Sequence, residues 1–190
     1  MRNHVHERIP IHSRAIQYES YLRMDGHWDI EGTLIDSKSY DQFLLEKGPL
    51  RAGSPIHHML VRLCIDDEFI IHEIFAEMPA TPFSACQPAR DPVQGLVGAK
   101  LGKGWRKRID ECMGGESGCT HLRELLSGMA TAAIQTVGRY RAHQRRTAGL
   151  PEPVMLHPRQ PLGECLGWSF TGEVMKRFRP EFYGWRPEQP

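Results

Sequence analysis

The stretch IHHMLVRLCIDDEFIIHEIFAEM, residues 56–78, decides the fold. It is an apolar segment interrupted by the acidic dipeptide Asp66-Asp67. Side chains of a strand alternate between two faces, so each half of the segment can bury one face in a sheet. The stretch therefore predicts a β-hairpin with its turn at Asp66-Asp67 and two antiparallel strands on either side.

That turn also fixes the register of the hairpin, because a slip of one residue would move every side chain to the other face. It pairs Leu63 with Ile70 and Val61 with His72. We expect His72 to be a hydrogen-bonded core residue, whereas His57, at the end of the sheet, is a candidate ligand. The predicted core face carries His57, Met59, Val61, Leu63, Ile65, Ile70, His72, Ile74 and Ala76.

The neighbouring segments predict one more hairpin and two loops. YLRMDGHWDIEGTLID, residues 21–36, predicts two strands joined at Asp25-Gly26, a dipeptide that suits a two-residue hairpin turn. Residues 37–55 contain Gly, Pro and mixed charges and predict a loop over the sheet. Four prolines between residues 79 and 92 predict a second loop, which carries Cys86.

The second half of the chain predicts mainly helices. GKGWRKRIDECMGG, residues 102–115, predicts a short amphipathic helix that Gly114 ends in the way usual for helix C-termini. From Thr120 we expect a longer helix, because apolar residues recur there at three- and four-residue spacing. Residues 165–183 predict a last strand hairpin around Thr171-Gly172. The apolar stripe of the longer helix consists of Leu122, Leu125, Leu126, Met129, Ala133 and Val137.

Strands come first in this order and helices follow. The order predicts the α+β class, with an antiparallel β-sheet built from hairpins and helices packed on one face. A chain of 190 residues is long enough to bury a real core. We expect a single domain over residues 10–180, with tails at 1–9 and 181–190.

The net charge, the N-terminal segment and the cysteine spacing argue against several classes of protein. A net charge of +1 gives no reason to expect nucleic acid or a membrane as partner. The N-terminus lacks the apolar middle of a signal peptide, so a cytoplasmic protein is expected. Five widely separated cysteines do not form the pattern of a secreted disulfide framework. A homodimer is a candidate assembly.

GGESGCTHLRELL, residues 114–126, places Cys119 and His121 where the longer helix begins. A helix N-terminus favours thiolate over thiol, and two residues this close can turn toward one ion. His57 lies at the end of the hairpin opposite its turn, and the second strand finishes at that same end before the loop with Cys86. The sequence therefore predicts one zinc or iron ion at this end of the sheet, held by His57, Cys86, Cys119 and His121.

Such a site would suit a carrier, a scaffold or, with one coordination position left open for water, a hydrolytic enzyme. Cys165 is a further candidate for the fourth ligand. The alternative is a metal-free, cysteine-dependent acyl-transfer or thioesterase-like enzyme, with Cys119 as nucleophile and His121 or His57 as base. A third interpretation is a binding module whose polar residues only shape a pocket. The candidate acids that would orient the base are Glu116, Glu124 and Asp29.

Three motifs resemble those of a bacterial family of domains of unknown function, over roughly residues 10–180. They are DGHWDIEGTLIDSKSYD (25–41), a Gly-x-Pro-Ile-His segment entering MLVRLCIDD (53–67), and GWRKRIDECMGGESGCTHLRELL (104–126). The third contains a Gly-Cys-Thr-His-Leu motif and is long enough to be specific. Membership of this family implies no established reaction.

The order of elements is also similar, more distantly, to that of iron–sulfur scaffold proteins of the IscU and NifU type. In that superfamily three cysteines, with an Asp or His, hold a zinc ion or a nascent cluster. The resemblance implies His57 or His58 at the first ligand position, Cys86 at the second, and Cys119 with His121 at the third. The first position lacks cysteine in this chain, which favours a mononuclear metal over cluster assembly.

Overall fold

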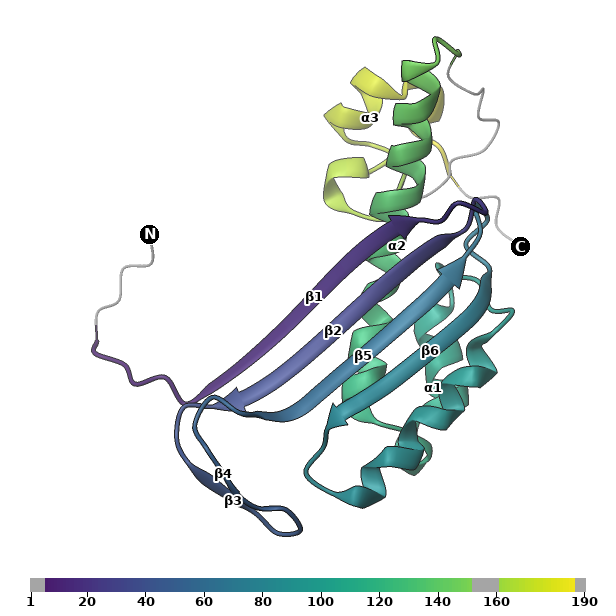
Figure 1. Cartoon of the computed structure of the whole chain (residues 1–190). Helices are drawn as coiled ribbons and strands as arrows, with labels where there is room; N and C mark the ends of the chain where they lie inside the picture. Colours follow the sequence, from purple (N-terminus) through teal and green to yellow (C-terminus); the bar gives the residue numbers. More distant parts are fainter. Residues whose placement is uncertain (1–5, 152–160, 187–190) are drawn as a thin grey trace. The chain divides into compact units, whose positions relative to one another are not determined.

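The computed structural model describes residues 6–151 and 161–186 (Figure 1). By its internal contacts the chain forms two compact units, residues 1–135 and 136–190, and each is described by itself. The outer ends of the two predicted tails lie outside the described residues, and the single domain over 10–180 stays a prediction. Within the described ranges, no helix is both long enough and apolar enough to cross a membrane.

The first unit is built on a four-stranded antiparallel sheet, which confirms the α+β prediction (Figure 1). The strand order is β1-β2-β5-β6. A small hairpin, β3 with β4, follows β2 in the chain, where a loop over residues 37–55 was expected. The strands are β1 (His12–Leu22), β2 (Trp28–Lys38), β3 (Gln42–Leu44), β4 (Gly48–Leu50), β5 (Pro55–Ile65) and β6 (Ile71–Ala80).

The predicted hairpin at residues 56–78 is confirmed, but its predicted register is wrong. Leu63 pairs with Ile74 and Val61 with Ala76, so β6 lies four residues further along than expected. The turn is longer than two residues because the Asp66 carboxylate accepts hydrogen bonds from the backbone N–H of both Glu68 and Ile70.

A β-bulge between Cys64 and Ile65 changes which residues of β6 face the core. Ile71 is buried there instead of Ile70. His72 is exposed, so its predicted place in the core is wrong, and its Nε2 lies 2.8 Å from Asp66 Oδ2.

Helices fill the chain after β6. The predicted proline loop is a 3-10 segment, η1 (Ser84–Leu96), which contains Cys86. The two predicted helices are present as α1 (Trp105–Met113) and α2 (Thr120–Thr147), separated by η2 (Gly115–Ser117). All six residues of the predicted apolar stripe of α2 are buried. Gly114, however, is extended, with φ −76°, instead of left-handed.

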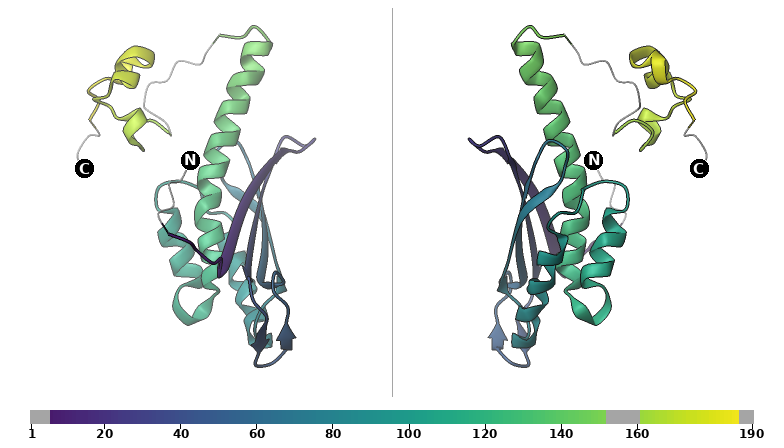
Figure 2. Two further views of the ribbon diagram at one scale, coloured as in Figure 1. Left: turned by 90° about the vertical axis from the view of Figure 1, so that its left-hand side faces the viewer. Right: turned by 90° about the vertical axis from the view of Figure 1, so that its right-hand side faces the viewer.

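Helices α1 and α2 lie on the same side of the sheet (Figure 2). Two glycines allow α2 to approach closely: a Cβ at Gly32 of β2 would lie 3.0 Å from Leu125 Cδ1, and one at Gly128 would clash with Tyr18. The Tyr18 hydroxyl donates to the carbonyl of Leu125 at 3.0 Å. Trp105 of α1 donates its indole N–H to the Leu126 carbonyl at 2.8 Å. These contacts fix where α2 begins relative to the strand ends.

The C-terminal unit is helical where a strand hairpin around Thr171-Gly172 was expected, so that prediction is wrong. Its elements after α2 are η3 (Leu166–Trp168), α3 (Glu173–Phe178) and η4 (Pro180–Phe182). Gly172 precedes α3 and its backbone N–H donates to the Ser169 carbonyl, which makes a turn before the helix. Leu162, Met175 and Phe182 form a small apolar core in this unit.

We expect the substitution Gly128→Ala to destabilise the first unit by about 1–3 kcal/mol, because the new methyl group must displace the Tyr18 ring. Gly138→Ala, further along the same helix and in the second unit, is the comparison. A Cβ there meets nothing within 4 Å, so it should stabilise by up to about 1 kcal/mol through helix propensity. Urea unfolding followed by circular dichroism measures both, and equal effects would contradict the close packing at Gly128.

Candidate metal centre

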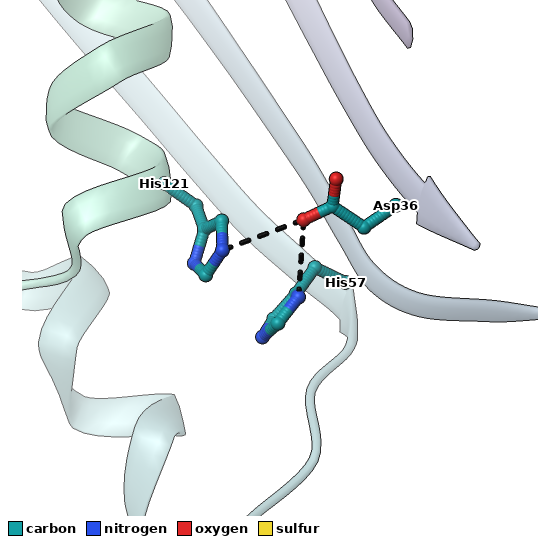
Figure 3. Close-up of side chains that lie close together, drawn as sticks. All are labelled: Asp36, His57 and His121. Atoms are coloured by element: carbon teal, nitrogen blue, oxygen red, sulfur yellow. Dashed lines mark ion pairs between the residues drawn. The ribbon is translucent and has the colours of Figure 1, made fainter. Parts of the chain in front are cut away.

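Three side chains from separate segments meet at one end of the sheet (Figure 3). Asp36 lies near the end of β2, His57 near the start of β5, and the two residues are partners in the register of these strands. His121 is in the first turn of α2. Asp36 continues the buried positions of β2, which alternate with half-buried or exposed ones, so its carboxylate points to the side of the sheet that α2 covers.

The ligand-type atoms of these residues all lie within 4.8 Å of one another. Asp36 Oδ2 is 3.2 Å from His57 Nδ1 and 3.4 Å from His121 Nε2. The two imidazole rings stack, with centroids 3.8 Å apart and planes 28° from parallel. The Asp36 side chain is 3% exposed, and the histidines are 20% and 19% exposed. The group is therefore nearly closed to water yet reachable from the surface.

Two residues of the edge strand β1 contact the buried carboxylate. Arg14 forms a bidentate ion pair with Asp36, with Nε to Oδ1 and Nη2 to Oδ2 both at 2.7 Å. His12 Nε2 lies 3.2 Å from Asp36 Oδ1. The remaining Arg14 nitrogen, Nη1, donates to Glu124 of α2 at 2.5 Å. Charge-assisted, bidentate pairs of this kind are the stronger hydrogen bonds in proteins.

The protonation states of the three residues suit cation binding. Burial alone would raise the pKa of Asp36, but the hydrogen bonds and charge of Arg14, helped by His12 and His121, lower it to about 2. Burial and the neighbouring His121 lower the pKa of His57. Burial and the charge of Arg14 lower the pKa of His121. At neutral pH the group therefore consists of one carboxylate and two neutral imidazoles, which are the ligand forms of these side chains.

Within this group, His57 Nδ1 is a buried atom that forms no hydrogen bond with any of the described residues. Its distance of 3.2 Å to Asp36 Oδ2 is within ion-pair range, but the two atoms do not meet the geometry of a hydrogen bond. Since buried polar atoms are rarely left unpaired, this nitrogen needs an explanation.

The structure brings together only part of the predicted ligand set. His57 and His121 meet, and Cys119 Sγ lies 3.7 Å from His121 Nδ1, on the other side of that ring from Asp36. Within the described residues, the group of side chains that could hold a metal ion includes neither Cys86, which lies in η1, nor Cys119. Cys165 belongs to the second unit.

Asp36 was missed by the sequence analysis, although one signal was present. It is a charged residue in phase with the buried apolar residues of β2, at the end of the strand. The candidate acid Asp29 has the opposite parity in that strand and lies 3.7 Å from Arg23. The candidate acid Glu124 pairs with Arg14. Arg14 itself reaches the site only through the β1–β2 register, which no local pattern reveals.

Comparison with known proteins gives one result for the family. A family model described as a protein of unknown function, DUF2889, matches residues 12–135, which is the greater part of the chain and includes Asp36, His57 and His121. No curated protein and no solved structure matches the chain. The predicted similarity to IscU and NifU scaffolds therefore has no support from these comparisons.

Because the pKa of both His57 and His121 is lowered when the chain folds, the unfolded chain takes up protons first as the pH falls. Their contribution to stability is complete above the ordinary histidine pKa of about 6.5 and is lost below it. We expect the unfolding free energy of chelator-treated protein to fall between about pH 7 and pH 5. Urea titrations across this range measure it.

The double variant His57→Ala, His121→Ala should show a flatter dependence of the unfolding free energy on pH over the same range. His58→Ala, next to His57 in β5, is the matched control and should keep the wild-type slope. If the double variant keeps the full slope, other groups cause the dependence.

Proposed function

The chain belongs to the DUF2889 family of proteins of unknown function, and we propose that it binds one divalent transition-metal ion, zinc or iron(II), through Asp36, His57 and His121. The observation that carries the proposal is the convergence of three ligand atoms from β2, β5 and α2 on one point. A carboxylate and two imidazoles from distant segments are a donor set that both metals accept.

The spacing of the atoms supports this proposal. Zinc bonds to nitrogen and oxygen of about 2.0–2.1 Å at tetrahedral angles separate the ligand atoms by about 3.3–3.4 Å. The distances from Asp36 Oδ2 to the two histidine nitrogens are 3.2 and 3.4 Å. His57 Nδ1, which lies 3.2 Å from Asp36 Oδ2 without meeting the geometry of a hydrogen bond, would bond to the ion instead.

In this proposal Cys119 orients His121 and is not itself a ligand. If His121 binds the ion through Nε2, its proton must be on Nδ1, which lies 3.7 Å from Cys119 Sγ and can donate to it. An acceptor on the far nitrogen of a metal-bound histidine fixes the tautomer and the ring orientation. Three protein ligands leave a position for water or a transferred ligand, so carrier, scaffold and hydrolytic roles are all consistent with the site.

The alternative, a metal-free thiol enzyme, is supported by the same contacts if His121 is the opposite tautomer, with its proton on Nε2. Cys119 would give its proton to His121 Nδ1, and Nε2–H would face Asp36 Oδ2 at 3.4 Å. This order of thiol, imidazole and carboxylate is that of a catalytic triad. We rank it second because it gives no role to His57, whose ring stacks on His121.

We also propose that the protein works in the cytoplasm. All five of its cysteines are free thiols, which suits a reducing compartment.

Elemental analysis of the full chain, purified without affinity tag or chelator, tests the metal proposal. We expect close to one equivalent of zinc or iron in the wild type, and loss of it in Asp36→Asn, His57→Ala and His121→Ala. His58→Ala is the matched control: it removes a neighbouring histidine of β5 and should keep the metal. A folded wild-type protein that takes up neither metal would overturn the proposal.

Two measurements on Cys119, the metal affinity of its serine variant and its rate of alkylation, distinguish the metal site from the thiol enzyme. In the metal site, Cys119→Ser should keep the metal with affinity reduced by about 10- to 100-fold, as for other residues that orient a ligand. In the thiol enzyme, metal-free protein should react with iodoacetamide at Cys119 much faster than at its other thiols, and His121→Ala should remove that excess. Mass spectrometry of the alkylated peptides reads this directly.

A further inference from the structure

Arg14 is hydrogen-bonded to the carboxylate oxygen of Asp36 that the proposed metal ion would bind. Its Nη2 donates to Asp36 Oδ2 at 2.7 Å, and Oδ2 is the carboxylate oxygen that faces both His57 and His121. The second bond, from Nε to Oδ1, holds the guanidinium in the plane of the carboxylate. An arginine in this position neutralises Asp36 as an ion at the same oxygen would.

Arg14 also has a second carboxylate within reach. Its Nη1 donates to Glu124 Oε2 at 2.5 Å. The Arg14 side chain is 33% exposed and belongs to the edge strand β1, so it has room to move. Glu124 is 46% exposed and lies one turn of α2 beyond His121. The guanidinium can therefore give up Oδ2 and remain paired with an anion.

We propose that Arg14 is a built-in competitor for Asp36 that keeps the bound metal exchangeable, so that the ion is cargo and not a permanent cofactor. This inference rests on the proposed metal site. Binding of the ion displaces Arg14 Nη2 from Oδ2 and shifts the guanidinium toward Glu124; release of the ion lets it return. When the ion leaves, Arg14 takes its place, so the buried Asp36 carboxylate always has a positive partner. This lowers the barrier to metal transfer.

The opposite role for Arg14 gives the opposite prediction. If Arg14 only orients Asp36, its removal should weaken metal binding about 10- to 100-fold. If it competes, its removal frees Oδ2 and takes a positive charge away from a divalent ion. Coulomb repulsion over a few ångströms near a protein surface is large enough to change affinity by about tenfold or more. The direction of the change therefore decides between the two roles.

The experiment is a competition titration of metal-free full-length protein with Zn²⁺ and a chromogenic chelator, with the release rate measured by excess chelator. We expect Arg14→Gln to bind Zn²⁺ about tenfold or more tighter than wild type and to release it more slowly. Arg14→Lys, which keeps the charge, should lie near wild type. Arg62→Gln, which removes an exposed arginine of β5 whose guanidinium lies over Phe75, is the matched control and should leave both quantities unchanged.

Weaker or unchanged binding in Arg14→Gln would overturn the competitor role while leaving the metal site in place. A wild-type protein that binds no Zn²⁺ would instead remove the proposed function, and this inference with it. If Arg14→Gln does not fold, the variant Glu124→Gln tests the proposal instead. Without Glu124 as its second partner, Arg14 holds Asp36 more firmly, so this variant should bind Zn²⁺ more weakly than its control. The control is Glu116→Gln, which removes the same charge from η2. Equal affinity of these two variants would overturn the proposal.

Discussion

A single buried carboxylate organises this end of the protein. Asp36 is 2% exposed and in line with the buried residues of β2, and an ionised carboxylate there is tolerated only if it is paired and hydrogen-bonded. Arg14 and His12 come to it from β1, His57 from β5 and His121 from α2. One carboxylate thus has contacts with both neighbouring strands and with the long helix: the Arg14 guanidinium neutralises its charge, and the imidazoles of β1, β5 and α2 lie around it.

The position of His121 depends on packing that lies well away from it. Tyr18 and the glycines at 32 and 128 let α2 lie against the sheet at a fixed depth, and the helix begins at Thr120 over the end of β2. A helix held further from the sheet would separate His121 from Asp36. Functional groups need positions fixed to about half an ångström, so the apolar stripe of α2 serves the site as much as the core.

The sequence predicted the strand hairpin at residues 56–78, both main helices and two of the three grouped residues, because periodicity and residue type are local signals. The predictions that were wrong concern features that depend on contacts between residues far apart in the sequence or on the geometry of a turn. The register of β6 depends on how the Asp66 carboxylate closes its turn and on a bulge at Cys64. Cysteines were favoured as ligands by residue type and by their predicted places at a helix N-terminus and after a strand end, whereas Asp36 became important only through its pairing with His57. The C-terminal hairpin was wrong because a turn signal at Thr171-Gly172 precedes a helix equally well.

The β3–β4 hairpin lies between Asp36 and His57 in the chain, although these two residues are neighbours across adjacent strands. The chain leaves the site after Asp36, forms this hairpin and returns to the same place. Longer loops cost little additional closure entropy. Insertions or deletions in this hairpin would therefore change the surface beside the site at little cost in free energy, while the three grouped side chains stay where they are.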